Sequence, residues 1–341
     1  MITTEPQDKT SSDREILLKD WLASISDKTL SNIKPASADA SFRRYFRVTD
    51  ENDGQTYIIM DAPPDKEDCE PFIHVTQLLR GAGVNAPEII RENKKQGFLL
   101  LSDLGNEIYL DHMTNEQADS LYSDAISSLV HMQKIKNNLP QYDAQRLRDE
   151  MELFETWYLN RHLSVHLNET QKTDLESIYG LLINSAIEQP QVFVHRDYHS
   201  RNLMLLNENN PGIIDYQDAV IGPISYDLVS LLKDCYIEWP RNKIEEWIDR
   251  FLFESDKERN QAFDREKFIR WFDLMGLQRH LKVLGIFSRL NYRDGKKQYL
   301  NDLPLTLKYV VDTCQKYDEL EPLHRLLEVL VLNHPMTIKK S

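Results

Sequence analysis

Hydrophobic and polar positions in the first hundred residues follow the pattern of a small sheet. Four short segments are rich in β-branched and aromatic residues, at 41–48, 56–62, 86–90 and 97–101. The turn-forming stretch 51–54 separates the first two, which predicts an antiparallel hairpin. The segment 71–83 has helical spacing closed by a glycine, and another helical pattern begins near residue 12.

From Asn115 onward the apolar residues change to the spacing of amphipathic helices. Long helical segments are predicted at about 146–165, 170–188, 243–253, 265–287 and 304–333. A strand-like interruption lies at 191–216. A sheet-rich part followed by a helical part is typical of the α+β class. We therefore predict an N-lobe over residues 1–102 and a C-lobe over residues 103–341, with a ligand site in the crevice between them.

A polar cluster separates two apolar segments in the stretch "VFVHRDYHSRNLMLL" at residues 192–206. His195, Arg196, Asp197 and Asn202 stand there in the order H-R-D-x-x-x-x-N. This is the spacing of the kinase catalytic loop, in which the aspartate accepts the proton of the substrate hydroxyl and the asparagine holds magnesium. Apolar flanks would hold such a loop rigid, because phosphoryl transfer is catalysed mainly by positioning and charge neutralisation.

A second carboxylate is expected close to this loop. The segments 202–206 and 212–216 read as two short strands joined by a turn, and such a hairpin would bring Asp215 beside Asn202. Carboxylate and amide oxygens are hard ligands suited to Mg²⁺. The alternative is that Asp197 and Asn202 are turn residues that cap a buried hairpin, and that Asp215 merely ends a strand.

With these motifs the chain resembles the aminoglycoside phosphotransferase-like superfamily of small-molecule kinases, from about Ser37 to Leu332. Within it the chain is most similar to the bacterial N-acetylmuramate/N-acetylglucosamine anomeric kinases of cell-wall recycling. The strings that carry this finer likeness are "SADASFRRYFRV", "MDAPP", "HRDYHSRNLM", "IDYQDAVIGPISYDLVSLLKDCY" and "SRLNYRDGKKQYLNDLP". The resemblance implies a two-lobe protein-kinase-like fold, the use of ATP and Mg²⁺, and phosphorylation of the sugar's C1 hydroxyl to an α-1-phosphate.

The resemblance also assigns roles around the catalytic loop. Asp197 would be the catalytic base, with Asn202 and Asp215 as the metal ligands. His195 is expected to order the loop by hydrogen bonding rather than to transfer protons. Asp227 would either cap the helix that follows it or brace the loop. In protein kinases the arginine of this motif often pairs with a phosphate on the activation loop, and the segment 216–227 shows no obvious phosphorylation site, so the role of Arg196 stays open.

The expected ATP site departs from the protein-kinase pattern in two ways. The segment "SADASFRRY" lacks the usual glycines, and the strand 56–62 lacks the usual lysine. Ser41 and its small neighbours would let backbone amides approach a phosphate, and Arg43 or Arg44 would replace the lysine. Strand alternation places these two arginines on opposite faces, so we expect one, preferably Arg44, to point inward. The alternative is that both face solvent.

Two further sets of residues complete the predicted site. In "LLLSDLG" the main chains of Ser102, Asp103 and Leu104 are expected to bind adenine, unless this is simply a strand that ends at a glycine turn. The acceptor candidates lie past the catalytic loop and in the C-lobe, and they are His199, Asp234, Tyr236, Gln278 and Arg279. Asp234 would bind sugar hydroxyls and the arginine the lactyl carboxylate of N-acetylmuramate, although each residue also fits an ordinary helix or loop position.

Charge and cysteine content limit the partners and the compartment. The 341 residues carry 41 basic and 55 acidic side chains, a net charge of −14, which argues against general nucleic-acid binding. The three cysteines are far apart and show no C-x-x-C pattern, which argues against a zinc site and a disulfide framework and fits a reducing cytoplasm. No apolar run is long enough to span a membrane. We expect a cytoplasmic monomer whose partner is a small amino sugar.

Two other functions remain open from the sequence. One is a kinase of a different small alcohol, of the aminoglycoside, choline or homoserine type. The other is a nucleotide-binding pseudokinase with a scaffolding role, which the missing lysine favours and the complete set Asp197, Asn202 and Asp215 disfavours.

Overall fold

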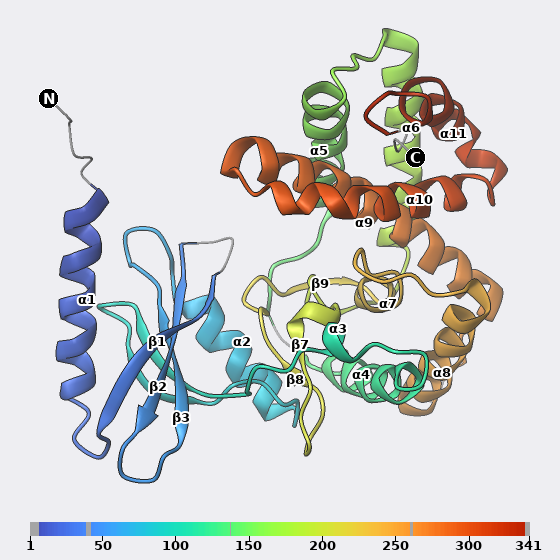
Figure 1. Cartoon of the computed structure of the whole chain (residues 1–341). Helices are drawn as coiled ribbons and strands as arrows, with labels where there is room; N and C mark the ends of the chain where they lie inside the picture. Colours follow the sequence, from blue (N-terminus) through green and yellow to red (C-terminus); the bar gives the residue numbers. More distant parts are fainter. Residues whose placement is uncertain (1–6, 39–41, 137, 260–261, 338–341) are drawn as a thin grey trace, which may run out of the picture. The chain divides into compact units, whose positions relative to one another are not determined.

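The computed structural model describes residues 7–38, 42–136, 138–259 and 262–337, and the chain forms two compact units (Figure 1). The first unit comprises Met1–Asn106 and Leu206–Gln217, and the second comprises Glu107–Leu205 and Asp218–Ser341. The boundary expected between residues 102 and 103 thus lies near a division after Asn106. The segment 206–217 also belongs to the first unit. The predicted division into two continuous stretches, 1–102 and 103–341, did not include this return of the chain.

The first unit contains a five-stranded antiparallel sheet in the order β1-β2-β3-β5-β4. Its strands are β1 (Leu30–Ala38), β2 (Arg44–Asp50), β3 (Thr56–Asp61), β4 (Ile89–Asn93) and β5 (Phe98–Ser102), and the short β8 (Gly212–Ile213) also belongs to this unit. The four predicted strands are confirmed, whereas β1 was not predicted. Pro35 lies within β1, and proline is tolerated there because β1 is an edge strand with an irregular register beside Pro35.

Two helices flank this sheet on opposite sides, α1 (Gln7–Ala23) and α2 (Glu70–Gly81) (Figure 1). Strand alternation explains the packing, because Tyr57 and Ile59 are two residues apart and both join a buried cluster with Leu18 and Trp21 of α1. The helix predicted from near residue 12 begins earlier, at Gln7. The predicted helix at 71–83 is confirmed as α2.

The second unit is mainly helical, as predicted. Its longer helices are α4 (Ala118–Met132), α5 (Ala144–Leu153), α6 (Glu169–Ile187), α7 (Tyr226–Leu232), α8 (Arg241–Arg259), α9 (Arg265–Asp294), α10 (Leu303–Cys314) and α11 (Glu321–Leu327). The unit also contains the single helical turn α3 (Tyr109–His112) and two π-helical segments, η1 (Phe154–His162) and η5 (Glu328–Leu332). Three short 3-10 helices are η2 (Ser200–Asn202), η3 (Lys297–Asp302) and η4 (Asp318–Leu320). None of the described helices is long and apolar enough to cross a membrane.

Helix α9 is the element around which the second unit is packed, since it contacts α5, α6, α7, α10 and η1. A glycine permits its close approach to the end of α5. A Cβ atom at Gly285 would lie 2.4 Å from the carbonyl carbon of Leu153, so a larger residue would force the two helices apart. This packing places the middle of α9, which carries Gln278, Arg279 and Lys282, in the interior of the unit.

Two antiparallel strands, β6 (Gln191–Val194) and β9 (Val220–Pro223), lie among these helices, and the short β7 (Leu203–Met204) also belongs to the second unit. Val192, Phe193 and Val194 are buried, and Val194 pairs with Val220. The apolar run before the catalytic motif is therefore a buried strand, as predicted. The catalytic loop, which begins at His195, therefore starts from a rigidly held strand.

Candidate active site

The loop that follows β6 is held together by its own hydrogen bonds. The main-chain N–H of Asp197 donates to Nδ1 of His195 at 3.2 Å, which is the ordering role expected for that histidine. The side-chain nitrogen of Asn202 donates to the main-chain oxygen of Asp197 at 2.9 Å. The main-chain N–H of Asn202 donates to the oxygen of His199 at 2.9 Å. These bonds bring Asp197 and Asn202 together within one compact turn.

Asp227 braces the start of this loop from α7. Its carboxylate accepts the main-chain N–H groups of His195 at 2.7 Å and of Arg196 at 3.0 Å. Of the two roles considered for Asp227, the bracing contact is the one observed. Burial raises the pKa of Asp227 to about 7, although both N–H donors act in the opposite direction.

Two residues of the predicted site have backbones in the left-handed region, Arg196 with φ 79° and Asp215 with φ 65°. A residue other than glycine in this region costs about 1–3 kcal/mol and persists only where its surroundings hold it there. Such residues cluster at functional sites. The backbone of Arg196 is held in this conformation by its main-chain hydrogen bond to Asp227 and by the ion pair of its side chain with Glu150 of α5.

Asp197 is partly buried and lies among positive charges within the second unit. Burial raises its pKa, but the charges of Lys282, His199, Arg279 and Arg196 outweigh this effect and leave the pKa below the ordinary value for aspartate. Asp197 is therefore ionised near neutral pH. An ionised carboxylate is the form that can accept a proton.

Lys282 and Glu150 are two residues of this site that the sequence reasoning missed. Nζ of Lys282 lies 3.0 Å from Oε1 of Glu150 and donates to the hydroxyl of Tyr226 at 3.0 Å. The Lys282 side chain is only 8% exposed. The sequence offered little signal for Lys282, because the stretch 277–287 also carries Gln278, Arg279 and His280, and a lysine in a helix is normally read as facing solvent.

Asp234 and Tyr236, predicted to contact the acceptor, lie beside the second half of the loop. The buried Asp234 carboxylate accepts the main-chain N–H of Ser200 at 3.0 Å, the Ser200 hydroxyl, and the main-chain N–H of Tyr236 at 3.2 Å. The ring of Tyr236 stands edge to face with that of His199, 5.5 Å between centroids. The guanidinium of Arg201 lies 3.5 Å from the centre of the Tyr236 ring.

The acceptor candidates also include buried polar atoms that lack partners. Arg279 is 4% exposed, and within the described chain its guanidinium makes one hydrogen bond, to the Cys235 sulfur at 3.7 Å. Burial raises the pKa of the Cys235 thiol, so this partner is neutral. Nδ1 of His199 and both amide atoms of Gln278 are buried without a hydrogen-bond partner among the described residues. Groups of this kind need a hydrogen-bond partner from outside the chain, such as water or a ligand.

In the first unit, one of the two arginine candidates, Arg44, contacts a buried carboxylate that was not predicted. Arg44 is the cross-strand partner of Asp61, and its Nε donates to Oδ2 of Asp61 at 3.0 Å. Arg14 of α1 binds the other oxygen of Asp61 at 2.7 Å. Arg43 immediately precedes β2. Ser41 lies outside the described residues.

The segment expected to bind adenine begins at Ser102, the last residue of β5. The Ser102 main-chain N–H donates to the oxygen of Glu88 at 2.9 Å. The Asp103 carboxylate is held by Arg47, with Nη2 to Oδ1 at 2.9 Å. Burial raises the pKa of Asp103, but hydrogen bonds from Arg47 and the Gly105 N–H outweigh it and lower the pKa overall. The side chain of Asp103 thus supports the segment, and the main chain of Leu104 forms no hydrogen bond within the described chain.

Asp215 lies in the first unit, in the segment that returns to it. Its Oδ1 accepts from Nε2 of Gln217 at 2.9 Å. Oε1 of Gln217 is buried and has no hydrogen-bond partner among the described residues. A carboxylate with a second hard oxygen beside it suits Mg²⁺. In Asn202 the amide nitrogen is used in the hydrogen bond to the Asp197 oxygen, and the other end of the amide is the oxygen that could bind a metal. The donor types of Asn202 and Asp215 therefore fit the predicted metal.

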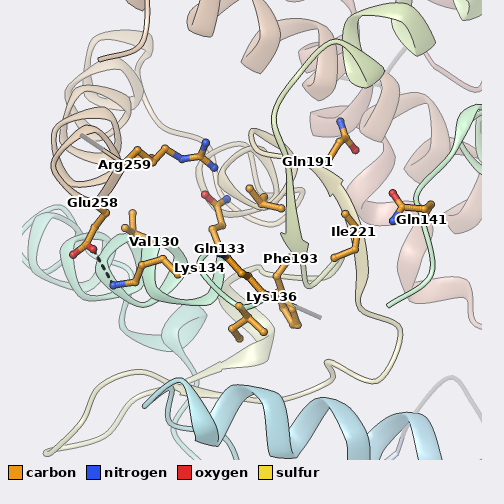
Figure 2. A pocket seen from close by; sticks show the side chains of 13 residues that line it. Val130, Gln133, Lys134, Lys136, Gln141, Gln191, Phe193, Ile221, Glu258 and Arg259 are labelled. Carbon is orange, nitrogen blue, oxygen red and sulfur yellow. Dashed lines mark hydrogen bonds and ion pairs between the residues drawn. The ribbon is translucent and has the colours of Figure 1, made fainter. Parts of the chain in front are cut away.

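A pocket of about 510 Å³ lies elsewhere in the second unit (Figure 2). Its walls include Gln133, Lys134 and Arg259 on one side and Phe193 and Ile221 of β6 and β9 on the other. Lys134 is paired with Glu258 at 3.1 Å. None of the predicted site residues is among its lining residues, so this pocket is separate from the catalytic loop.

Comparisons with known proteins show which family the chain belongs to. The chain is 46% identical over 303 residues to the N-acetylmuramate/N-acetylglucosamine kinase of Pseudomonas aeruginosa, covering 87% of this chain and 88% of that protein. It is 41% identical over 328 residues to the protein of the same name from Neisseria meningitidis, covering 93% and 96%. These matches confirm the resemblance drawn from the sequence.

Solved structures share the fold at low sequence identity. An ethanolamine kinase from Plasmodium vivax matches with a TM-score of 0.64 and 12% identity, covering 92% of this chain and 91% of that one. A choline kinase from Streptococcus pneumoniae matches with a TM-score of 0.63 and 13% identity, covering 87% and 99%. The predicted protein-kinase-like α+β fold is thereby confirmed. The model of the phosphotransferase enzyme family matches residues 32–268, and the chain belongs to this family.

Proposed function

We propose that this protein is a cytoplasmic kinase that uses ATP and Mg²⁺ to phosphorylate the anomeric hydroxyl of N-acetylmuramate and N-acetylglucosamine, giving the sugar 1-phosphates used in peptidoglycan recycling. The observation that carries the proposal is the 46% identity, over most of both chains, to a kinase named for these two sugars. The arrangement around Asp197 supports it, because an ionised carboxylate on a rigid loop suits proton acceptance from a hydroxyl.

Asp197 is the proposed base. It would orient the C1 hydroxyl of the sugar and take its proton late in the reaction, which a weak base can do because an anomeric hydroxyl is more acidic than an ordinary alcohol. Asn202 and Asp215 would hold Mg²⁺, which when bound neutralises charge on the phosphates of ATP. One of the two arginines, Arg43 or preferably Arg44, would meet the same phosphates with Ser41, and the main chain at Ser102, Asp103 and Leu104 would bind adenine.

The acceptor would lie against His199, Asp234, Tyr236, Gln278 and Arg279. Arg279 is the proposed partner of the lactyl carboxylate of N-acetylmuramate. Arg279 is buried, and although Asp197 and Asp234 lie near enough to favour its charged form, its guanidinium forms no direct ion pair within the described chain. An anionic group of the substrate would satisfy it through paired hydrogen bonds.

An acceptor panel tests this function directly. ADP release would be measured with N-acetylmuramate, N-acetylglucosamine, an aminoglycoside, choline and homoserine, at fixed ATP and Mg²⁺. We expect turnover with both amino sugars and a product whose phosphate is released by mild acid, as for a sugar 1-phosphate. An acid-stable product would contradict the anomeric position. Turnover of another alcohol alone, or ATP binding without any turnover, would replace the proposal by one of the other two functions.

A further inference from the structure

The pocket of Figure 2 is lined by two cations that form no direct ion pair within the described chain. Its charged lining residues are Lys134, Lys136, Glu258 and Arg259. Lys134 and Glu258 neutralise each other, with Nζ 3.1 Å from Oε2. Neither Lys136 nor Arg259 makes a hydrogen bond or an ion pair with another described residue. The lining therefore keeps an excess of positive charge, in a chain whose net charge is −14.

The guanidinium of Arg259 is poorly compensated where it stands. Its side chain is open to solvent, and it packs against the ring of Phe263 with 5.6 Å to the ring centre. Partial burial lowers the pKa of Arg259, and the nearby charge of Asp256 offsets this only in part. An anion bound through paired N–H donors would stabilise the charged guanidinium, and phosphate and carboxylate are the groups that match its geometry.

A fixed hydrogen-bond acceptor lies beside this cation. Nε2 of Gln133 donates to the main-chain oxygen of Ile224 at 2.9 Å, which holds the amide in one orientation. The amide oxygen of Gln133 accepts no hydrogen bond from another described residue. In Figure 2 the ends of the Gln133 and Arg259 side chains point toward one another. A ligand that satisfies both needs an anionic group and a donor such as a hydroxyl.

The size and the apolar wall of the pocket narrow the class of ligand. A volume of about 510 Å³ lies within the range of small-molecule sites and exceeds what a bare phosphate fills. Ile135 and Ile221 are partly exposed on its wall, which suits the C–H face of a sugar ring. Phe193 also lines the pocket but is fully buried, so it offers no free ring face on which a nucleobase would stack.

We propose that this pocket is a second ligand site, which binds a phosphorylated sugar with its phosphate on Arg259 and Lys136 and a hydroxyl donating to Gln133. The site lies between the ends of α4 and α8 and the strands β6 and β9, apart from the residues assigned to the active site. The reaction proposed above yields a ligand of this class. The choice of N-acetylglucosamine 1-phosphate as the probe rests on that proposed function, and the site itself rests on the lining residues.

The test is a calorimetric titration of the whole chain with N-acetylglucosamine 1-phosphate. A saturating non-hydrolysable ATP analogue and Mg²⁺ are present, because the γ-phosphate of the analogue occupies the position that the phosphate of a product would take in the active site. We expect one binding event in the wild type. Arg259→Gln and Lys136→Gln are each expected to weaken it about 10-fold or more, because each removes a charged partner of the phosphate.

Arg250→Gln is the matched control, because Arg250 lies on the same helix, does not line the pocket and pairs with Glu254 at 3.0 Å. Its affinity for the probe is expected to equal that of the wild type. Inorganic phosphate and AMP are titrated under the same conditions, and each is expected to bind about 10-fold more weakly than the sugar phosphate. Inorganic phosphate or AMP binding as tightly as the sugar phosphate would overturn the assignment of the ligand.

The second site and the proposed function fail in different ways. No binding by the wild type, or binding that Arg259→Gln and Lys136→Gln leave unchanged, would overturn the second site even in a protein that phosphorylates both amino sugars. A protein that binds the probe through Arg259 but phosphorylates neither sugar would keep the site and overturn the proposed function. The acceptor panel and the titration therefore report on separate parts of the second unit.

Discussion

Replacing Asp227 is the most direct test of how the catalytic loop is supported. Its carboxylate accepts two main-chain N–H groups, from His195 at 2.7 Å and Arg196 at 3.0 Å, and it is fully buried. In Asp227→Ala both N–H groups lose their acceptor where water does not reach them. In Asp227→Asn one acceptor oxygen remains, and the amide nitrogen faces an N–H donor.

The magnitude follows from these two bonds. A buried donor left unsatisfied costs about 1–3 kcal/mol, so Asp227→Ala is expected to destabilise the protein by roughly 2–6 kcal/mol. At about 2–4 °C for each kcal/mol, this lowers Tm by roughly 4–24 °C. Asp227→Asn is expected to lie between this variant and the wild type. Because the loop also loses its orientation, kcat is expected to fall about 10- to 100-fold in the fraction that remains folded.

Thermal unfolding and ADP release would be measured on the same preparations. Asp312→Asn is a suitable control, because Asp312 is 48% exposed and pairs with Lys308 one turn earlier on α10. Such an exposed pair contributes less than about 0.5 kcal/mol. Equal melting temperatures for Asp227→Ala and Asp312→Asn would refute the bracing role. Unchanged kcat in a destabilised Asp227 variant would separate folding from catalysis and refute the second half of the reasoning.

Three further predictions follow from the same contacts. Asp197→Asn is expected to lower kcat by about 10²–10⁴-fold with little change in Tm, because it removes the proposed base but no hydrogen bond that supports the main chain. A variant that fails to fold would show that Asp197 has a structural role instead. Arg279→Gln is expected to lower kcat/KM for N-acetylmuramate about 10- to 100-fold more than for N-acetylglucosamine, which has no carboxylate and serves as the control. An equal loss with both sugars would contradict the assignment of Arg279 to the carboxylate. Finally, burial raises the folded-state pKa of Asp227 to about 7, so the stability that its protonated form provides is present below pH 4 and is lost as the pH rises through 7. The stability of the wild type relative to Asp227→Asn, measured by urea unfolding, should therefore decrease between pH 5 and pH 8, whereas a constant difference would show that Asp227 does not titrate in this range.

The sequence by itself determined the catalytic loop and most of the sheet. His195, Asp197 and Asn202 lie within eight consecutive positions, so their hydrogen bonds are local and their spacing identifies them. The strands β2, β3, β4 and β5 were predictable because alternation is a property of neighbouring residues. Strand β1 was missed because Pro35 reads as a break, although an edge strand accepts it.

Only the tertiary structure decided which charges surround that loop. Glu150, Lys282 and Asp61 each lie in a helix or strand where a charged residue is normally read as facing solvent, and their ion partners are distant along the chain. The alternatives considered for Asp227, a helix cap or a loop brace, use the same residue type at the same position. Sequence patterns report local periodicity, whereas burial and electrostatic interaction depend on distances in space, and the packing of α5, α7 and α9 around the loop set those distances.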